Sequence, residues 1–152
     1  MKFSDHWPNF KVEEVLSPTQ LQLFERKGVF PYSFRALDKL QEFRTFVGLP
    51  FLINHGSLER RGARSMKDVF EINSQTRGRE RAWEWSFHLW CAFDISVEGM
   101  SPMDLYEKAI DFGKWGGIGI YNTFVHVDDR DWFDMPQRWD ARYSLDKDKR
   151  EA

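Results

Sequence analysis

The chain has 152 residues, of which 24 are acidic and 22 are basic, so its formal net charge is −2. An apolar fraction of 41%, with 14 phenylalanines and 7 tryptophans, supplies core material for one domain and excludes a wholly disordered chain. The near balance of charges argues against a domain built to hold nucleic acid. The single cysteine, Cys91, cannot form an internal disulfide, so nothing in the sequence requires an oxidising compartment.

The amino-terminal segment does not resemble a signal peptide, because it lacks an apolar run of about 7–15 residues. No stretch reaches the roughly 18 uninterrupted apolar residues of a membrane span. We therefore expect a protein without a membrane partner. We also expect it to be a monomer. It should stay in the cytoplasm where it is made unless another agent exports or releases it.

Two helices are predicted in the first third of the chain. Ser17 and Pro18 begin the first and Gly28 ends it, while the second begins near Ser33 and ends at Gly48. Apolar residues recur in the second at three- and four-residue spacing and form one stripe. The stripe consists of Phe34, Leu37, Leu40, Phe43 and Val47.

The middle of the chain carries a different pattern. Residues 50–53 predict a short buried strand. Residues 55–83 are rich in arginine and have few periodic apolar positions, which predicts a long loop or a set of short pieces. Loops of this length inside a compact domain are uncommon and often functional.

Strand signals surround one further helix in the last third of the chain. Residues 92–97 alternate with period two, which is typical of a half-buried strand. A helix is predicted over 102–112. Two strands, 117–121 and 123–128, are joined by a tight turn at Asn122.

This order of elements predicts an α+β fold with a small antiparallel sheet, N-terminal helices and one crossing helix. We expect a single domain over residues 1–135, followed by a charged and peripheral C-terminal tail over 136–152.

Three potential metal ligands, His88, Asp94 and His126, lie on or beside the predicted strands. Two imidazoles and one carboxylate form a catalytic zinc set that leaves the fourth tetrahedral position for water or substrate. Zinc in such a site lowers the pKa of water and polarises a carbonyl. Cys91 lies between two of these residues in sequence. Its thiolate is an alternative ligand if Asp94 is displaced, and its other interpretation is a buried, inert thiol.

Several motifs resemble one family of enzymes. Residues 86–95, SFHLWCAFDI, resemble the S-x-H-x-x-G-x-A-x-D-I motif of the zinc D-Ala-D-Ala carboxypeptidase and L-alanyl-D-glutamate peptidase family. Residues 116–121, GGIGIY, and 124–130, FVHVDDR, are similar to the GGxGxY and FxHxDxR motifs of that family. Residues 61–65, RGARS, resemble its upstream arginine motif. The resemblance covers residues 12–131 in order.

The resemblance implies a hedgehog-type fold and a zinc peptidase that acts on the stem peptides or crosslinks of bacterial peptidoglycan, as many phage endolysins do. It implies that His88, Asp94 and His126 hold Zn²⁺. It also implies that Arg64 binds the substrate, with Arg61 as the alternative, and the planar fork of arginine suits a peptide carboxylate. An endolysin-like protein would collect in the host cytoplasm before release to the cell wall, or would be associated with the virion.

One departure from the family pattern concerns the ligand spacing. Five residues separate His88 from Asp94, whereas the family has six. A deletion within a strand would turn Asp94 to the opposite face, but a deletion in the preceding turn would leave the ligand geometry intact.

A second departure concerns the general base. Thr123 stands where many members carry a glutamate or aspartate. Asp128 is the preferred replacement because it shares a strand face with His126, and Glu84 is the next candidate. Support of a zinc-bound His126 is the competing role for Asp128.

These departures leave a second function open. The chain could be a catalytically inactive relative that serves as a cell-wall-binding or virion structural module. A nucleic-acid binder based on the arginine-rich segment is a weaker third interpretation, because acidic residues offset that charge.

Overall fold

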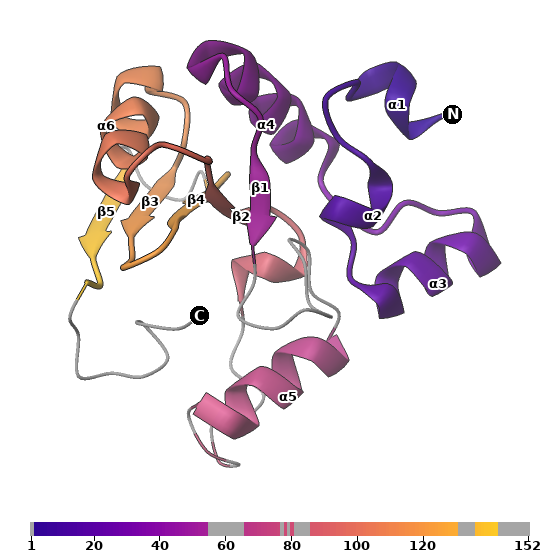
Figure 1. Ribbon diagram of the computed structural model, residues 1–152. Helices are drawn as coiled ribbons and strands as arrows, with labels where there is room; N and C mark the ends of the chain where they lie inside the picture. Colours follow the sequence, from indigo (N-terminus) through magenta and orange to yellow (C-terminus); the bar gives the residue numbers. More distant parts are fainter. Residues whose placement is uncertain are drawn as a thin grey trace.

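The computed structural model describes residues 2–54, 66–76, 78, 80, 86–130 and 136–142. Within these residues the chain forms six α-helices and one five-stranded sheet in a single mixed α and β domain (Figure 1). The predicted combination of helices and a small sheet is confirmed. None of the described helices has the length and apolar character needed to cross a membrane.

The first part of the chain is helical, and its helix boundaries follow the sequence signals. Ser17 and Ser33 each accept a hydrogen bond from the backbone N–H three residues further on. Gly28 and Gly48 end the same two helices with φ of 67° and 78°, a conformation that favours glycine. The helices are α1 (Phe3–His6), α2 (Val12–Val15), α3 (Pro18–Lys27) and α4 (Phe34–Val47).

Helix α5 (Met66–Thr76) corrects the interpretation of residues 55–83 as a loop or short pieces. Phe70 is half-buried and Asn73 is buried, and their three-residue spacing places them on one face of the helix. A polar residue therefore occupies part of the inward face. A prediction based on apolar periodicity therefore does not detect this helix.

The sheet has the strand order β1-β2-β4-β3-β5. Pairing is antiparallel between β1 and β2, β2 and β4, and β3 and β4, but β3 and β5 are parallel. The sheet is therefore mixed, which corrects the prediction of a purely antiparallel one. The strands are β1 (Leu52–Asn54), β2 (Ala92–Ser96), β3 (Gly117–Ile120), β4 (Val125–Asp128) and β5 (Gln137–Asp140).

Strand β5 comes from the segment that the sequence assigned to the charged tail. It is an edge strand with mostly exposed side chains, so its sequence QRWD lacks the apolar alternation that predicts a strand. Backbone hydrogen bonds from Gln137 N to Gly116 O and from Ala141 N to Ile120 O hold it beside β3. Residues 137–140 thus belong to the sheet, and residues 143–152 lie outside the described part of the chain.

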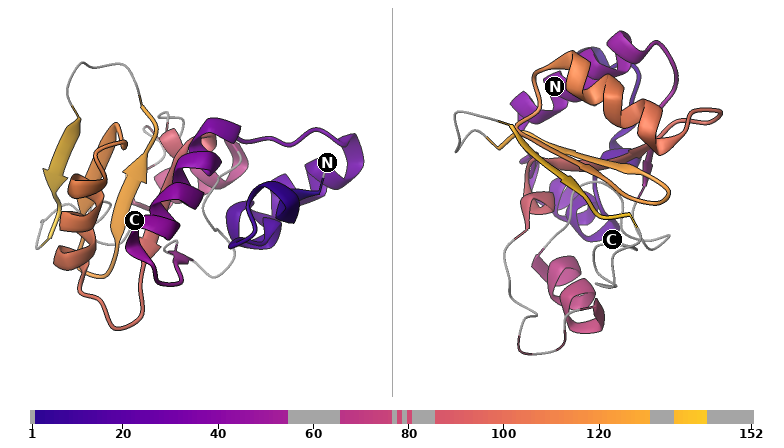
Figure 2. Two further views of the ribbon diagram at one scale, coloured as in Figure 1. Left: turned by 90° about the horizontal axis from the view of Figure 1, so that it is seen from above. Right: turned by 90° about the vertical axis from the view of Figure 1, so that its left-hand side faces the viewer.

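Helices α4 and α6 (Pro102–Phe112) lie over one face of the sheet (Figure 2, right). Helix α6 packs on β3 and β4 and against α4, and it provides the predicted crossing between β2 and β3. Leucine and aromatic side chains of both helices form one core with alternate residues of the strands. This core includes Leu37, Leu40, Phe43, Phe93, Ile95, Leu105, Ala109, Val125 and Val127.

Candidate metal centre

One row of paired residues crosses the sheet on the face opposite the core. Asp94 of β2 pairs with His126 of β4, His126 pairs with Gly119 of β3, and Gly119 pairs with Trp139 of β5. The immediate neighbours of Asp94 and His126 along their strands belong to the core. Because side chains alternate along a strand, Asp94 and His126 both project from the other face. The register therefore places two of the predicted ligands side by side.

His88 reaches this face from a 3₁₀ turn, η2 (Phe87–Leu89), that precedes β2. The Ser86 side chain accepts a hydrogen bond from the His88 backbone N–H at 3.2 Å and caps the turn. His88 thus lies in a turn before the strand, and Asp94 lies within the strand. Asp94 keeps the same face as His126, which resolves the alternative that the ligand spacing left open.

The three side chains converge around one carboxylate oxygen. Asp94 Oδ1 lies 3.1 Å from His126 Nδ1 and 3.4 Å from His88 Nε2. One ligand atom from each of the three buried residues lies within 4.8 Å of the others. Tetrahedral zinc with bonds of about 2.0–2.2 Å separates its ligand atoms by about 3.3–3.6 Å. The donor types and spacing of this group fit a metal ion.

Burial and pairing shape the charges of the group. Burial by itself would raise the pKa of Asp94, but His88 and His126 outweigh it and hold this pKa well below its usual range. Burial would lower the pKa of His126, but hydrogen bonds to Asp128 and Asp94 outweigh it and raise the pKa to about 9. Without a metal, His126 is therefore an imidazolium at neutral pH, and a cation is favoured at this place.

Asp128 lies on the far side of the His126 ring. Its Oδ2 is 2.7 Å from His126 Nε2, whereas His126 Nδ1 faces Asp94. Arg130 donates to the same carboxylate from Nε at 2.7 Å, from Nη2 at 2.5 Å and from its backbone N at 3.1 Å. A carboxylate behind a ligating histidine fixes the ring and its tautomer. Of the two roles open to Asp128, this geometry favours support of His126 over proton transfer.

The pKa of Asp128 also favours support of His126 over proton transfer. Burial would raise it, but Arg130 and His126 hold it well below its usual range, and the side chain is fully buried. A carboxylate that is inaccessible and stays ionised is a poor proton carrier. Thr123, at the position of the expected base, is exposed in the turn between β3 and β4.

Cys91 is not part of the group formed by His88, Asp94 and His126, which we call the ligand group. It lies with the core residues on the other face of the sheet and is 1% exposed. Burial, followed by the nearby Asp128 charge, raises the pKa of its thiol to about 12. Of the two alternatives for Cys91, a replacement metal ligand or a buried and inert thiol, the structure supports the second.

The surroundings of the site contain residues that sequence reasoning missed. The Trp139 ring lies 5.2 Å from the His126 ring, and the Arg130 guanidinium lies 4.0 Å from the centre of the Phe87 ring. Glycines inside a strand indicate a close approach by another group, and Gly117 and Gly119 were the available signal for these contacts. Arg64, Arg61 and Glu84 lie outside the described residues.

No protein-family model, curated protein or solved structure matches the chain.

Proposed function

We propose that the protein is a zinc-dependent peptidase that hydrolyses peptide bonds in the stem peptides or crosslinks of bacterial peptidoglycan. The observation that carries the proposal is the buried group of His88, Asp94 and His126 with the spacing of a metal site. The motif resemblance of residues 86–95 and 116–130 supports the substrate class. It also supports an endolysin-like place of action, in the host cytoplasm before release to the wall or on the virion.

Each side chain of the site has a separate role in this proposal. His88, Asp94 and His126 would hold the ion, and Asp128 would keep the His126 ring in place. Zinc held by three protein ligands supplies Lewis acidity toward a carbonyl and a water molecule. Arg64 would bind a carboxylate of the stem peptide through its planar fork.

Metal content provides the first test. Elemental analysis of purified protein should find one zinc per chain, and His126→Ala should lose it because one of three ligands is removed. His6→Ala is the matched control, since His6 is an exposed histidine on α1 and should leave the zinc content unchanged. Equal zinc in wild type and His126→Ala, or no metal in wild type, would contradict the site.

Activity on purified cell walls provides the second test. Arg64→Ala should strongly reduce the release of peptide ends while the melting temperature changes by no more than a few degrees. The sequence places Arg64 in a polar, arginine-rich segment, and substitution of a solvated charge usually has such a small effect on stability. Full activity of Arg64→Ala would transfer the substrate-binding role to Arg61 or remove it.

A second candidate function is a catalytically inactive relative that binds the wall or forms part of a virion. Two observations favour it: the exposed Thr123 replaces the expected base, and Asp128 is committed to Arg130 and His126. Glu84 remains the candidate base under the peptidase proposal. A protein that binds zinc but cleaves no chemotype of peptidoglycan would establish the inactive relative instead.

A further inference from the structure

Arg130 occupies an unusual position behind the ligand group. Its guanidinium carbon lies 4.0 Å from the centre of the Phe87 ring and 5.2 Å from that of the Trp139 ring. The same guanidinium binds both oxygens of Asp128. The side chain is thus held by two aromatic contacts and a two-pronged ion pair. Little freedom is left to it.

These contacts reach both histidine ligands. Asp128 accepts a hydrogen bond from His126 Nε2, so Arg130 acts on His126 through one carboxylate. Phe87 directly precedes His88 in the 3₁₀ turn, so the ring packed on Arg130 belongs to the turn that carries His88. One guanidinium therefore contacts the immediate supports of both imidazoles.

The sheet provides the space for this arrangement. A β-carbon on Gly117 would lie 2.6 Å from Arg130 Nε and equally close to Asp128 Oδ1. A β-carbon on Gly119 would collide with the indole of Trp139. Strand β3 thus lacks side chains on this face at the two positions over which the Arg130 and Trp139 groups lie.

We propose that Arg130 is a positioning residue that orients both histidine ligands, His126 through Asp128 and His88 through Phe87. The proposal rests on the metal site of the proposed function. The role needs the planar fork of arginine, because that shape binds two carboxylate oxygens while its flat faces pack on aromatic rings. Lysine keeps the charge beside Asp128 but provides neither feature.

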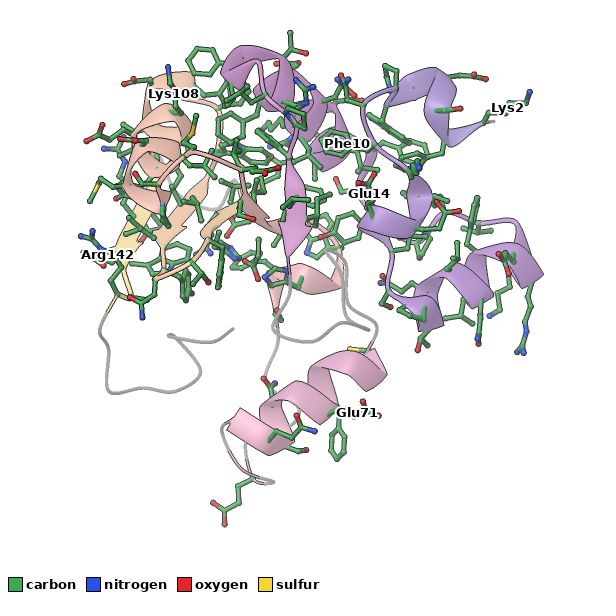
Figure 3. All side chains as sticks on the ribbon, in the orientation of Figure 1. Lys2, Phe10, Glu14, Glu71, Lys108 and Arg142 are labelled. Atoms are coloured by element: carbon green, nitrogen blue, oxygen red, sulfur yellow. The ribbon has the colours of Figure 1, made fainter. Side chains whose placement is uncertain are left out.

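The chain contains a matched control for this test. Arg142 binds Asp140 with the same three donors, namely backbone N at 2.9 Å, Nε at 3.0 Å and Nη2 at 2.7 Å. This second pair lies at the end of the edge strand β5, at the outer side of the sheet (Figure 3), where Asp140 is exposed and Arg142 is half-buried. Arg142→Lys therefore makes the same chemical change at a carboxylate other than Asp128.

Zinc affinity, measured by competition with a chelator, should fall about 10–100-fold in Arg130→Lys, the usual effect of removing an outer partner of a metal ligand. Arg142→Lys should keep the wild-type affinity. With Co²⁺ in place of zinc, the visible d–d bands of Arg130→Lys should shift or broaden because the histidines are less fixed, whereas those of Arg142→Lys should not. Unchanged affinity and unchanged Co²⁺ bands in a folded Arg130→Lys would overturn the proposal.

A second variant covers the case in which Arg130→Lys does not fold. Phe87→Leu removes one of the two aromatic rings that pack on Arg130, so it should weaken zinc binding and alter the Co²⁺ bands. A folded Phe87→Leu with wild-type zinc affinity and wild-type Co²⁺ bands would overturn the role.

If wild type binds no metal, the peptidase proposal fails separately. NMR contacts between the His126 and Trp139 rings should then persist in Arg142→Lys and vanish in Arg130→Lys, and their persistence in Arg130→Lys would overturn the positioning role.

Discussion

The two ring nitrogens of His126 have different partners, and this difference determines what the residue can do. Nε2 faces Asp128, and Nδ1 faces Asp94 and the ligand group. Asp128 accepts a hydrogen bond from Nε2–H and so leaves the Nδ1 lone pair to bind a cation. In the metal-free protein the two carboxylates instead stabilise a second proton on the ring. A metal and a proton therefore compete for Nδ1.

Metal affinity should consequently rise with pH. The pKa of His126 is about 9 in the metal-free protein, so the ring is protonated below that pH and must lose a proton when the metal binds. Affinity should increase about tenfold per pH unit from neutral pH toward pH 9 and should level off above pH 9, where the ring has already lost the proton. Calorimetric titration at pH 7 in buffers of different ionisation heat should detect release of about one proton per ion. Binding without proton release would contradict this competition.

The structure also changes the expected effect of a substitution at Asp128. If Asp128 transferred protons, Asp128→Asn would lower turnover while zinc stayed bound. Because Asp128 supports His126, Asp128→Asn should lower zinc affinity by about 10–100-fold. Asp140→Asn, which alters the exposed copy of the same arginine pair, is the control for chelator competition. Full zinc affinity with reduced turnover would return the proton-transfer role to Asp128.

At the scale of elements, strands β3 and β5 show where sequence reasoning works and where it fails. Local signals predicted helices α3, α4 and α6, strands β1 to β4 and the three potential metal ligands that the fold brings together. Strand β5 was missed because an edge strand pairs through its backbone and needs no apolar alternation. The contact of Trp139 with His126 was missed for a related reason: it arises from the register between strands, which the sequence of a single strand does not contain. The pair of Arg130 and Asp128 is local, at two-residue spacing, but the sequence does not show which way the two side chains point.

The close approach of Trp139 to β3 can be tested through Gly119. The added methyl group of Gly119→Ala would collide with the indole, and such overpacking typically costs about 1–3 kcal/mol of unfolding free energy. Denaturant unfolding should show this loss. In a Trp139→Ala background the same change should cost less, because the colliding ring is gone, so the two substitutions should be non-additive. Additive losses would show that the ring does not occupy this space.

At the scale of the whole molecule, one face of the sheet contributes to the core and the other carries the candidate metal centre. One face joins α4 and α6 in a continuous apolar core that does not involve the ligands. The other face carries the ligand group, which links β2, β4 and the turn η2. Burial of the apolar face supplies the main driving force for folding. The proposed metal is thus expected to add stability to a fold that forms without it.

Removal of the metal should therefore weaken the protein without unfolding it. A ligand that binds only the folded state adds about 2.7 kcal/mol when its free concentration is a hundred times its dissociation constant. For a domain of this size, 1 kcal/mol corresponds to about 2–4 °C, so chelation should lower the melting temperature by about 5–11 °C. Calorimetry should still show one cooperative transition for the chelated protein, and His126→Ala should melt at the same temperature with and without chelator. Complete unfolding of the chelated wild type at 25 °C would instead make the metal essential for the fold, because the core of α4, α6 and the sheet would then be insufficient alone.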